Sequence, residues 1–441
     1  MTYIVLITIL LFMVLMTYVV FKKDSLSPTF ISCVAFLCCS FLGFIGLHYW
    51  NNQSDLSYRL IIIISMGLMA FFFGEIVARK LIKIVDEKVV RKKINISKKL
   101  YYITIFFVIM TIFLLIIEIK KICNFYNFYS HSIPELLAFY RGKMELFDTA
   151  LATDGLSINF FVKQMKKMCD VICVIWMYIL LNNYFIQKNK KELIKNSIPI
   201  ILCLLSTLMT SGRSLLMHRC VSFIIMYLIF MKIYFSNKQN GKKVLLTVFA
   251  FGVCTLSIFY LVLPLVGRKT NSNPVEYFSF YLGTPIPSFN VYLNSPSTKK
   301  NIYIGEETFN NIYQTLNRFH IIDYKKAKTH NWIQFSKFSS NVFTSFRCYY
   351  NDFGIMGVII LQFVAGFMIT AMYLNVLHKK KPIMVIIYSY YGYMLIDQIR
   401  DEQFFNLISS STFVYLILIV AMYYIYIKGV NYKPKLHTKR C

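Results

Sequence analysis

An arginine stands where two long apolar segments meet, in the stretch Thr210-Ser-Gly-Arg213-Ser. The segments are joined almost without a loop, so we expect the side chain of Arg213 at or just inside a membrane interface. A charge at that depth is costly unless it is paired or faces water. The guanidinium offers a planar fork of donors that fits a phosphate group. The alternative is an arginine that extends along its helix to the lipid headgroups.

A second polar motif leads directly into an apolar segment late in the chain. It reads Asn341-Val-Phe-Thr-Ser-Phe-Arg347-Cys-Tyr-Tyr350-Asn-Asp352-Phe-Gly354. Asp-Phe-Gly also occurs in protein kinases, but this sequence has neither their glycine-rich loop nor their catalytic-loop motif. We expect Asp352 in the first turn of the helix that follows, where a carboxylate caps backbone N–H groups. Capping alone would account for this residue.

A third stretch is crowded with aromatic residues. It runs Glu276-Tyr-Phe-Ser-Phe-Tyr281 and continues as Gly283-Thr-Pro-Ile-Pro287. The glycine and the two prolines predict a break in any helix at this point. Tyr281 and its neighbours offer ring faces on which the C–H faces of sugars stack. Aromatic residues that line a membrane interface are the alternative.

Other charged residues are weaker candidates. Arg141, in Phe139-Tyr-Arg-Gly142, is the best arginine of an earlier polar segment and is a candidate for ligand contact. Arg400 has Asp397 three residues before it and Asp401 next to it, so we expect an ion pair with a structural role. The sequence has no metal-binding, phosphate-loop or nucleophile-elbow motif.

The composition is that of a membrane protein. Apolar residues make up 57% of the 441 residues and charged residues 15%, against about 45–50% and 25% in soluble domains. Continuous apolar runs of about 20 residues recur along the chain. This excludes a soluble enzyme, a disordered chain and a disulfide scaffold, and continuous runs exclude a transmembrane β-barrel. The net charge of +28 lies mostly in short loops, as the positive-inside rule expects, so nucleic-acid binding is not favoured.

The elements that must position these residues are membrane-spanning helices, about eleven of them, with ten or twelve left open. We expect them at about 2–21, 28–50, 59–78, 100–119, 168–186, 196–211, 214–235, 244–266, 354–377, 383–399 and 407–427. The chain is then one integral membrane domain, residues 1–441. Its larger outer loops are residues 120–167 and 267–353, and residues 428–441 form a cytoplasmic tail. The distribution of Lys and Arg places the N-terminus outside and the C-terminus in the cytoplasm.

These motifs resemble those of the bacterial oligosaccharide repeat-unit polymerases, the Wzy-type O-antigen and capsule polymerases. The matching elements are Thr210-Ser-Gly-Arg213, the Tyr277-to-Pro287 stretch, and Asn341-Val-Phe-Thr followed by Asn-Asp352-Phe-Gly. Many spans and one dominant outer loop late in the chain also fit. The resemblance covers the chain from about residue 195 onwards, and the first half only as hydropathy. A paired arginine-and-glycine arrangement described for some members is not evident here.

The resemblance implies an all-α polytopic membrane glycosyltransferase with a GT-C-like fold. It would join repeat units carried on undecaprenyl pyrophosphate at the outer face of the bacterial cytoplasmic membrane. The growing glycan would pass to the next lipid-linked repeat without a metal or another cofactor. The partners implied are the lipid-linked glycan and the bilayer, with a chain-length regulator and a flippase. An O-antigen ligase and a lipid-linked oligosaccharide flippase or transporter are the alternatives.

Site roles can be assigned on that resemblance. The leaving group is a lipid pyrophosphate, whose developing negative charge preorganised arginines would stabilise. The acceptor hydroxyl needs a base, for which the resemblance implies Asp352 or Glu276, with His320 and His330 as weaker choices. Substrate-binding roles are assigned to Arg213 first, and then to Arg141, Arg268, Arg347, Tyr281, Asn341 and Tyr350.

Overall fold

A computed structural model of the chain describes residues 1–50, 55–87, 92–146, 157–210, 213–234, 241–267, 272–295, 302–324, 332–335 and 338–429. Helices dominate these residues, and a single short hairpin supplies their strands. Eight helices in the described ranges are long and apolar enough to cross a membrane. The expectation of an all-α polytopic membrane protein is therefore confirmed. The chain divides into two compact units, which we describe separately.

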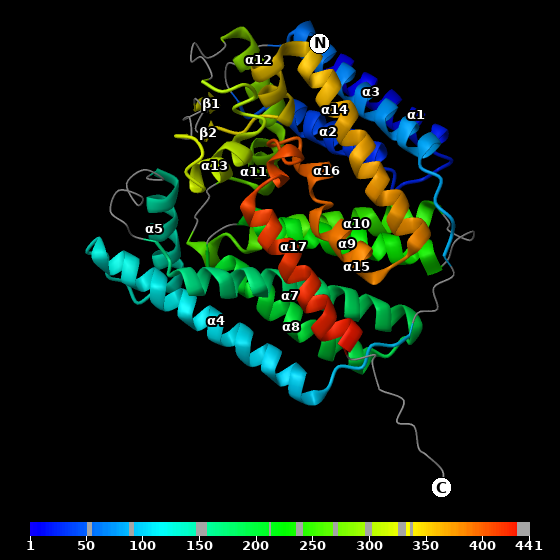
Figure 1. The fold of residues 1–441 in the computed structure, drawn as a ribbon. Helices are drawn as coiled ribbons and strands as arrows, with labels where there is room; N and C mark the ends of the chain where they lie inside the picture. The colour runs from blue at the N-terminus through cyan, green and yellow to red at the C-terminus, as the bar shows by residue number, and fades with distance from the viewer. Residues whose placement is uncertain are drawn as a thin grey trace. The chain divides into compact units, whose positions relative to one another are not determined.

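Unit 1 comprises Met1–Glu87, Asn271–Lys380 and Gly392–Phe413. Its elements are α1 (Thr2–Val20), α2 (Pro28–Gly46), α3 (Tyr58–Leu81), α11 (Pro274–Gly283), α12 (Pro285–Asn294), α13 (Asn310–Arg318), β1 (Ile333–Phe335), β2 (Phe338–Ser340), α14 (Ser345–Lys379), α16 (Met394–Asp397) and η2 (Phe405–Leu407) (Figure 1). The strands β1 and β2 are antiparallel, with Gln334 opposite Ser339. The expected outer loop 267–353 is therefore largely folded into short helices and this hairpin.

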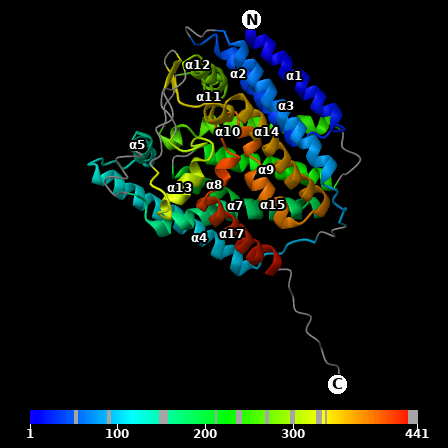
Figure 2. The same cartoon turned by 45° about the horizontal axis from the view of Figure 1, so that its top comes forward.

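Unit 2 comprises Lys88–Thr270, Lys381–Tyr391 and Val414–Cys441. Its elements are α4 (Lys98–Phe125), α5 (Ile133–Leu146), α7 (Phe160–Ile186), α8 (Lys190–Leu208), α9 (Arg213–Tyr234), α10 (Gly241–Leu261), η1 (Pro264–Val266), α15 (Pro382–Tyr391), most of α17 (Ser410–Tyr423) and η3 (Tyr424–Lys428). Helices α4, α7 and α8 pack side by side (Figures 1 and 2). Within α7, residues 169–183 are all buried, as in a helix surrounded by others.

Several expected boundaries are wrong. The span expected at 354–377 begins at Ser345. The span expected at 168–186 begins earlier, at Phe160, because the Asn159 side chain caps the helix by accepting from the N–H of Phe161. The span expected at 383–399 is not one helix, because α15 ends at Tyr391 and α16 covers only Met394–Asp397. The break places the following polar residues in an irregular segment of unit 1.

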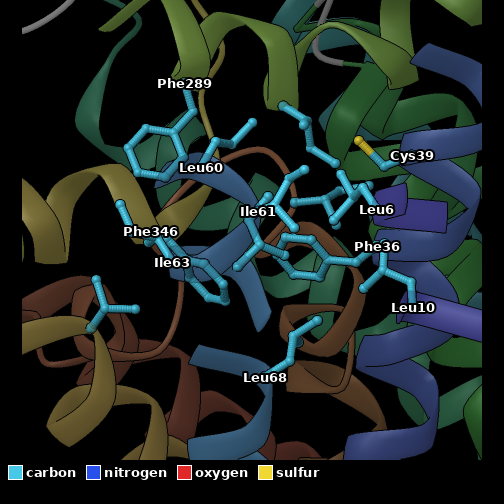
Figure 3. Close-up of a cluster of buried hydrophobic side chains, with 14 of the residues drawn as sticks. Leu6, Leu10, Phe36, Cys39, Leu60, Ile61, Ile63, Leu68, Phe289 and Phe346 are labelled. Atoms are coloured by element: carbon cyan, nitrogen blue, oxygen red, sulfur yellow. The ribbon is translucent and has the colours of Figure 1, made fainter. Parts of the chain in front are cut away.

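The core of unit 1 lies among α1, α2, α3, α12 and α14. Leu6, Phe36, Leu60, Phe289 and Phe346 meet there (Figure 3). The rings of Phe36 and Phe346 stack, with centroids 5.1 Å apart. Side-chain hydroxyls at Ser27 and Ser57 cap the first turns of α2 and α3, which satisfies backbone donors that would otherwise be lost at a helix start. This core fixes the start of α14, where the second sequence motif lies.

Glycines allow the backbones of α3 and α14 to approach closely. A Cβ atom on Gly74 would lie 2.2 Å from the carbonyl oxygen of Phe363, and one on Gly366 would lie 2.3 Å from that of Phe71. Small residues at helix contacts are typical of membrane proteins, because close packing replaces the hydrophobic effect there. The close packing of α3 against α14 therefore helps to hold the polar residues at the start of α14 in place.

Candidate functional site

Arg347 lies in the first turn of α14, and its guanidinium is buried. The side chain is 2% exposed, and its Nη1 atom lies 2.7 Å from Oε2 of Glu307. The rings of Tyr292 and Phe343 lie beside the guanidinium, with centroids 5.4 and 5.1 Å from Cζ. A buried ion pair between aromatic rings is poorly screened by water, so each charge strongly affects the other.

Glu307 is the carboxyl group in this cluster whose pKa best suits a general acid or base. Burial raises its pKa to about 7, Arg347 lowers it in part, and the nearby carboxylate of Asp352 raises it further. A carboxyl group with a pKa near neutrality exists in both forms at physiological pH, as a general acid or base requires. The sequence motifs did not single out Glu307, because its pKa depends on residues far from it in the chain.

Asp352 lies five residues after Arg347 and holds the segment that carries Glu307. Its Oδ2 atom accepts from the backbone N–H of Thr308 at 2.7 Å and from the Thr308 hydroxyl at 2.6 Å. Its Oδ1 atom accepts from the N–H of Glu307 at 3.4 Å. The expectation that Asp352 occupies the first turn of its helix is wrong, because α14 begins at Ser345. The carboxylate caps backbone donors of a different segment.

Gly354 explains the Asp-Phe-Gly part of the motif. Its φ of 65° and ψ of −159° interrupt α14 directly after Asp352 and Phe353. A side chain is strained in this region of backbone conformation, which is essentially restricted to glycine. The break separates the polar start of α14, which carries Arg347 and Asp352, from the long apolar part of the helix.

Tyr350 and Asn351 tie the start of α14 to other elements of unit 1. The Tyr350 hydroxyl accepts from Arg59 of α3, whose guanidinium also lies 5.3 Å from the ring centroid. The hydroxyl of Tyr292 donates to the side-chain oxygen of Asn351. Tyr350, which was predicted to bind substrate, therefore contacts the guanidinium of Arg59.

A second group of polar residues surrounds the irregular segment after α16. Glu402 is fully buried and accepts from the Tyr349 hydroxyl at 3.0 Å and from the N–H groups of Phe405 and Asn406 at 2.8 Å. Burial raises its pKa to about 7, although these donors lower it. The geometry makes Glu402 a support for the segment rather than an open base.

Arg400 belongs to the same segment and stacks on Tyr281. Its Cζ atom lies 5.1 Å from the ring centroid, and its Nη1 atom lies 3.6 Å from Oδ1 of Asp397. The side chain is 19% exposed, which is more than Arg347. Tyr281 therefore presents one face to a cation, and the ion pair that the sequence predicted for Arg400 is present.

Three tyrosines gather close to the acidic residues. Tyr303, Tyr313 and Tyr324 have ring centroids 5.1 to 5.8 Å apart. The helix α13 that carries Tyr313 is joined to the segment after Glu402 by a hydrogen bond from Asn311 to the carbonyl of Asn406. Clustered rings of this kind suit the C–H faces of sugars.

The remaining predicted residues lie elsewhere. Glu276 is half-buried in the first turn of α11, where its N–H donates to the side chain of Asn273. Asn341 is half-buried between β2 and α14. The helix break predicted at Gly283 is confirmed, since α11 ends there and α12 begins at Pro285.

The other predicted arginines belong to unit 2 or lie outside the described residues. Arg213 is the first residue of α9, is buried, and stacks on Phe259 of α10 with Cζ 4.4 Å from the ring centroid. Arg141 is half-buried in α5. Arg268 and His330 lie outside the described residues, whereas His320, at the end of α13, has a positive φ of 57°.

No group of three or more His, Cys, Asp or Glu side chains within the described ranges is arranged to hold a metal ion. No protein-family model, curated protein or solved structure matches the chain.

Proposed function

We propose that this protein polymerises undecaprenyl-pyrophosphate-linked oligosaccharide repeat units into O-antigen or capsular polysaccharide at the outer face of the bacterial cytoplasmic membrane. The observation that supports this most is the pair of Glu307 and Arg347, which combines a carboxyl group of pKa about 7 with a guanidinium. Arg347 lies at the polar start of a membrane-spanning helix, and Glu307, which comes from an earlier segment, lies near a cluster of tyrosines. A base, a cation for phosphate and aromatic rings for sugar are the parts that the reaction needs.

In the proposed reaction Glu307 acts as the general base. Its carboxylate takes the proton from the acceptor hydroxyl as that oxygen attacks the anomeric carbon of the growing chain. The bond from the anomeric carbon to the phosphate oxygen breaks, and the lipid pyrophosphate leaves with the electron pair. The carboxylate of Asp352 is engaged by the Thr308 and Glu307 donors. We therefore assign Asp352 a positioning role in place of the base role that its motif suggested.

Guanidinium groups would stabilise the leaving pyrophosphate. The Nε atoms of Arg347 and Arg400 are buried and have no hydrogen-bond partner among the described residues. Each guanidinium thus retains a donor for a phosphate oxygen, and such charge-assisted bonds are the strong ones. Arg213, Arg141 and Arg268 remain proposed substrate-binding residues, on the resemblance stated above.

The proposal includes the finer architecture that the resemblance implies. We propose about eleven spans in a GT-C-like arrangement, with the N-terminus outside and the C-terminus in the cytoplasm. A chain-length regulator and a flippase are the proposed partners. Glu276 stays a second candidate for the base, and Asn341, Tyr350 and Tyr281 stay candidates for contact with sugar.

A deletion strain distinguishes this proposal from its alternatives. Surface polysaccharide from the host is resolved on a gel after the gene is removed. A polymerase predicts that the ladder collapses to a single repeat on its final acceptor. A ligase predicts complete loss of surface repeats with polymer accumulating on the lipid carrier. A flippase or transporter predicts single repeats trapped inside the cell, and either of these last results would overturn the proposal.

A further inference from the structure

Unit 2 contains a buried cluster of charged residues, whereas the pair of Glu307 and Arg347 belongs to unit 1. Asp170 comes from α7, Arg219 from α9, Tyr390 from α15 and Tyr415 from α17. Asp170 and Arg219 have exposed fractions of 0% and 1%. Charges buried within membrane-spanning helices are costly and usually have a function.

The carboxylate of Asp170 contacts a cation of its own helix. Its Oδ2 atom accepts from the ammonium of Lys166 at 3.3 Å, and the Tyr415 hydroxyl donates to the same atom at 3.3 Å. Lys166 and Asp170 are four residues apart on α7, a spacing at which side chains meet. Asp170 also attracts the positive charge of Arg219, so this one carboxylate faces more than one cation.

Two donor atoms of Arg219 lack acceptors in the described part of the chain. Its Nε and Nη1 atoms are buried and have no hydrogen-bond partner among the residues that the structure describes. Burying a donor without an acceptor is unfavourable, and more so for a charged group. Its Cζ atom lies 3.9 Å from the centroid of the Tyr390 ring, and Tyr390 in turn contacts Tyr415 with ring centroids 5.6 Å apart.

Stacking on Tyr390 occupies the face of the guanidinium, and its Nε and Nη1 donors, which lie in its plane, remain without acceptors among the described residues. Each of these two donors can take an oxygen of a phosphate-type anion as its acceptor. Lys167 lies over the Tyr415 ring, with Nζ 5.7 Å from the centroid, so the cations Lys166, Lys167 and Arg219 exceed the single carboxylate of Asp170. An anion would therefore satisfy both the hydrogen bonds and the charge.

We propose that Arg219, supported by Tyr390, binds a phosphate-type oxyanion within unit 2. The same chemistry is offered by the headgroup of an anionic phospholipid and by free phosphate. This site goes beyond the proposed function, since it takes no part in the transfer step assigned to Glu307. It can exist whether or not the protein is a polymerase.

Binding to the purified, delipidated full-length protein tests the proposal. Thermal stability in detergent is measured against inorganic phosphate, phosphatidylglycerol and, as the uncharged comparison, phosphatidylcholine. Stabilisation by inorganic phosphate identifies a free oxyanion as a ligand, whereas stabilisation by phosphatidylglycerol alone identifies a headgroup. In either case the apparent affinity should fall at least tenfold in Arg219→Gln. No stabilisation beyond phosphatidylcholine by either anion in wild type overturns the proposal.

Two further variants keep the test decisive. Arg219→Lys retains a buried cation and replaces Arg219→Gln if the latter does not fold. It lacks the planar fork, so binding should still weaken at least tenfold. The control is Lys191→Gln on α8, an exposed lysine of the same unit, which should bind as wild type does. Equal weakening in the control, or wild-type binding in Arg219→Lys, would contradict a site built on Arg219.

Discussion

Oε2 of Glu307 lies 2.7 Å from Nη1 of Arg347, and Asp352 holds the backbone of Glu307 and Thr308 in place for that contact. The three residues come from two segments of the chain that meet at the polar start of α14. A carboxyl group of pKa about 7, a buried guanidinium and a supporting carboxylate are thereby assembled in unit 1.

The first prediction concerns the pH dependence of transfer. A base acts in its deprotonated form, so activity should rise with pH and level off above a midpoint near 7, the pKa of Glu307. Glu307→Gln cannot accept the proton and should lose about 100-fold or more. Initial rates of polymer formation on purified lipid-linked repeats, measured from pH 5.5 to 8.5, provide the test. A wild-type rate that does not change across this range would contradict the assignment.

The second prediction concerns Asp352 as a positioning residue. Its negative charge raises the pKa of Glu307, so Asp352→Asn should shift the midpoint of the rate profile to lower pH. Thr308→Val is the matched control, because it removes the donor of a hydrogen bond to Asp352 without changing charge. It should lower the rate and leave the midpoint in place. Equal midpoints in Asp352→Asn and wild type would show that Asp352 does not influence Glu307.

The third prediction concerns stability. The pKa values of Glu307 and Glu402 are raised from 4.5 to about 7 in the folded chain. A carboxyl group of this kind stabilises the fold fully below about pH 4.5, and the contribution is lost as the pH rises through about 7. Thermal unfolding in detergent between pH 5 and 8 should therefore show a steeper fall for wild type than for Glu307→Gln. Parallel curves would mean that Glu307 is not protonated in the fold.

The fourth prediction concerns the break in α14. Gly354→Ala forces a side chain into a backbone conformation with φ of 65°, which should cost about 1–3 kcal/mol and misplace Asp352. Gly252→Ala is the control, since a Cβ atom there meets nothing within 4 Å and its φ is ordinary. Membrane-inserted protein and its melting temperature are measured for both. A Gly354→Ala protein as stable as the control would contradict the strain.

The fifth prediction concerns Arg213. If this residue binds phosphate through its fork, Arg213→Lys should lower polymer yield at least about tenfold, although the charge remains. Arg213→Lys should also reach the membrane at normal levels. The length distribution of surface polysaccharide in a complemented deletion strain gives the readout. Normal polymer from Arg213→Lys would contradict phosphate binding by the fork of Arg213.

Long apolar runs allowed the membrane-spanning helices to be predicted, because a span needs only length and hydropathy. The boundary of α7 was missed, since Lys163 and Lys166 continue the helix beyond its apolar part and Lys166 pairs with Asp170 one turn later. The break after Tyr391 was missed for the opposite reason, since the apolar run continues where the helix does not.

The candidate site was predictable only in part. Arg347 and Asp352 stand in a recognisable motif, and both belong to the observed cluster. Glu307 could not be found in this way, because its raised pKa arises from burial against α14 and from Asp352, neither of which is visible near Glu307 in the sequence. Its position in Gly305-Glu-Glu307, within the polar loop, is the only local signal.

The most direct test complements the deletion strain with Glu307→Gln and with Asp323→Asn, an exposed carboxylate of the same loop region. Both proteins are quantified in the membrane before surface polysaccharide is resolved on a gel. If Glu307 is the general base, Glu307→Gln gives single repeats and Asp323→Asn gives a full ladder. A full ladder with Glu307→Gln at wild-type protein levels would contradict this role.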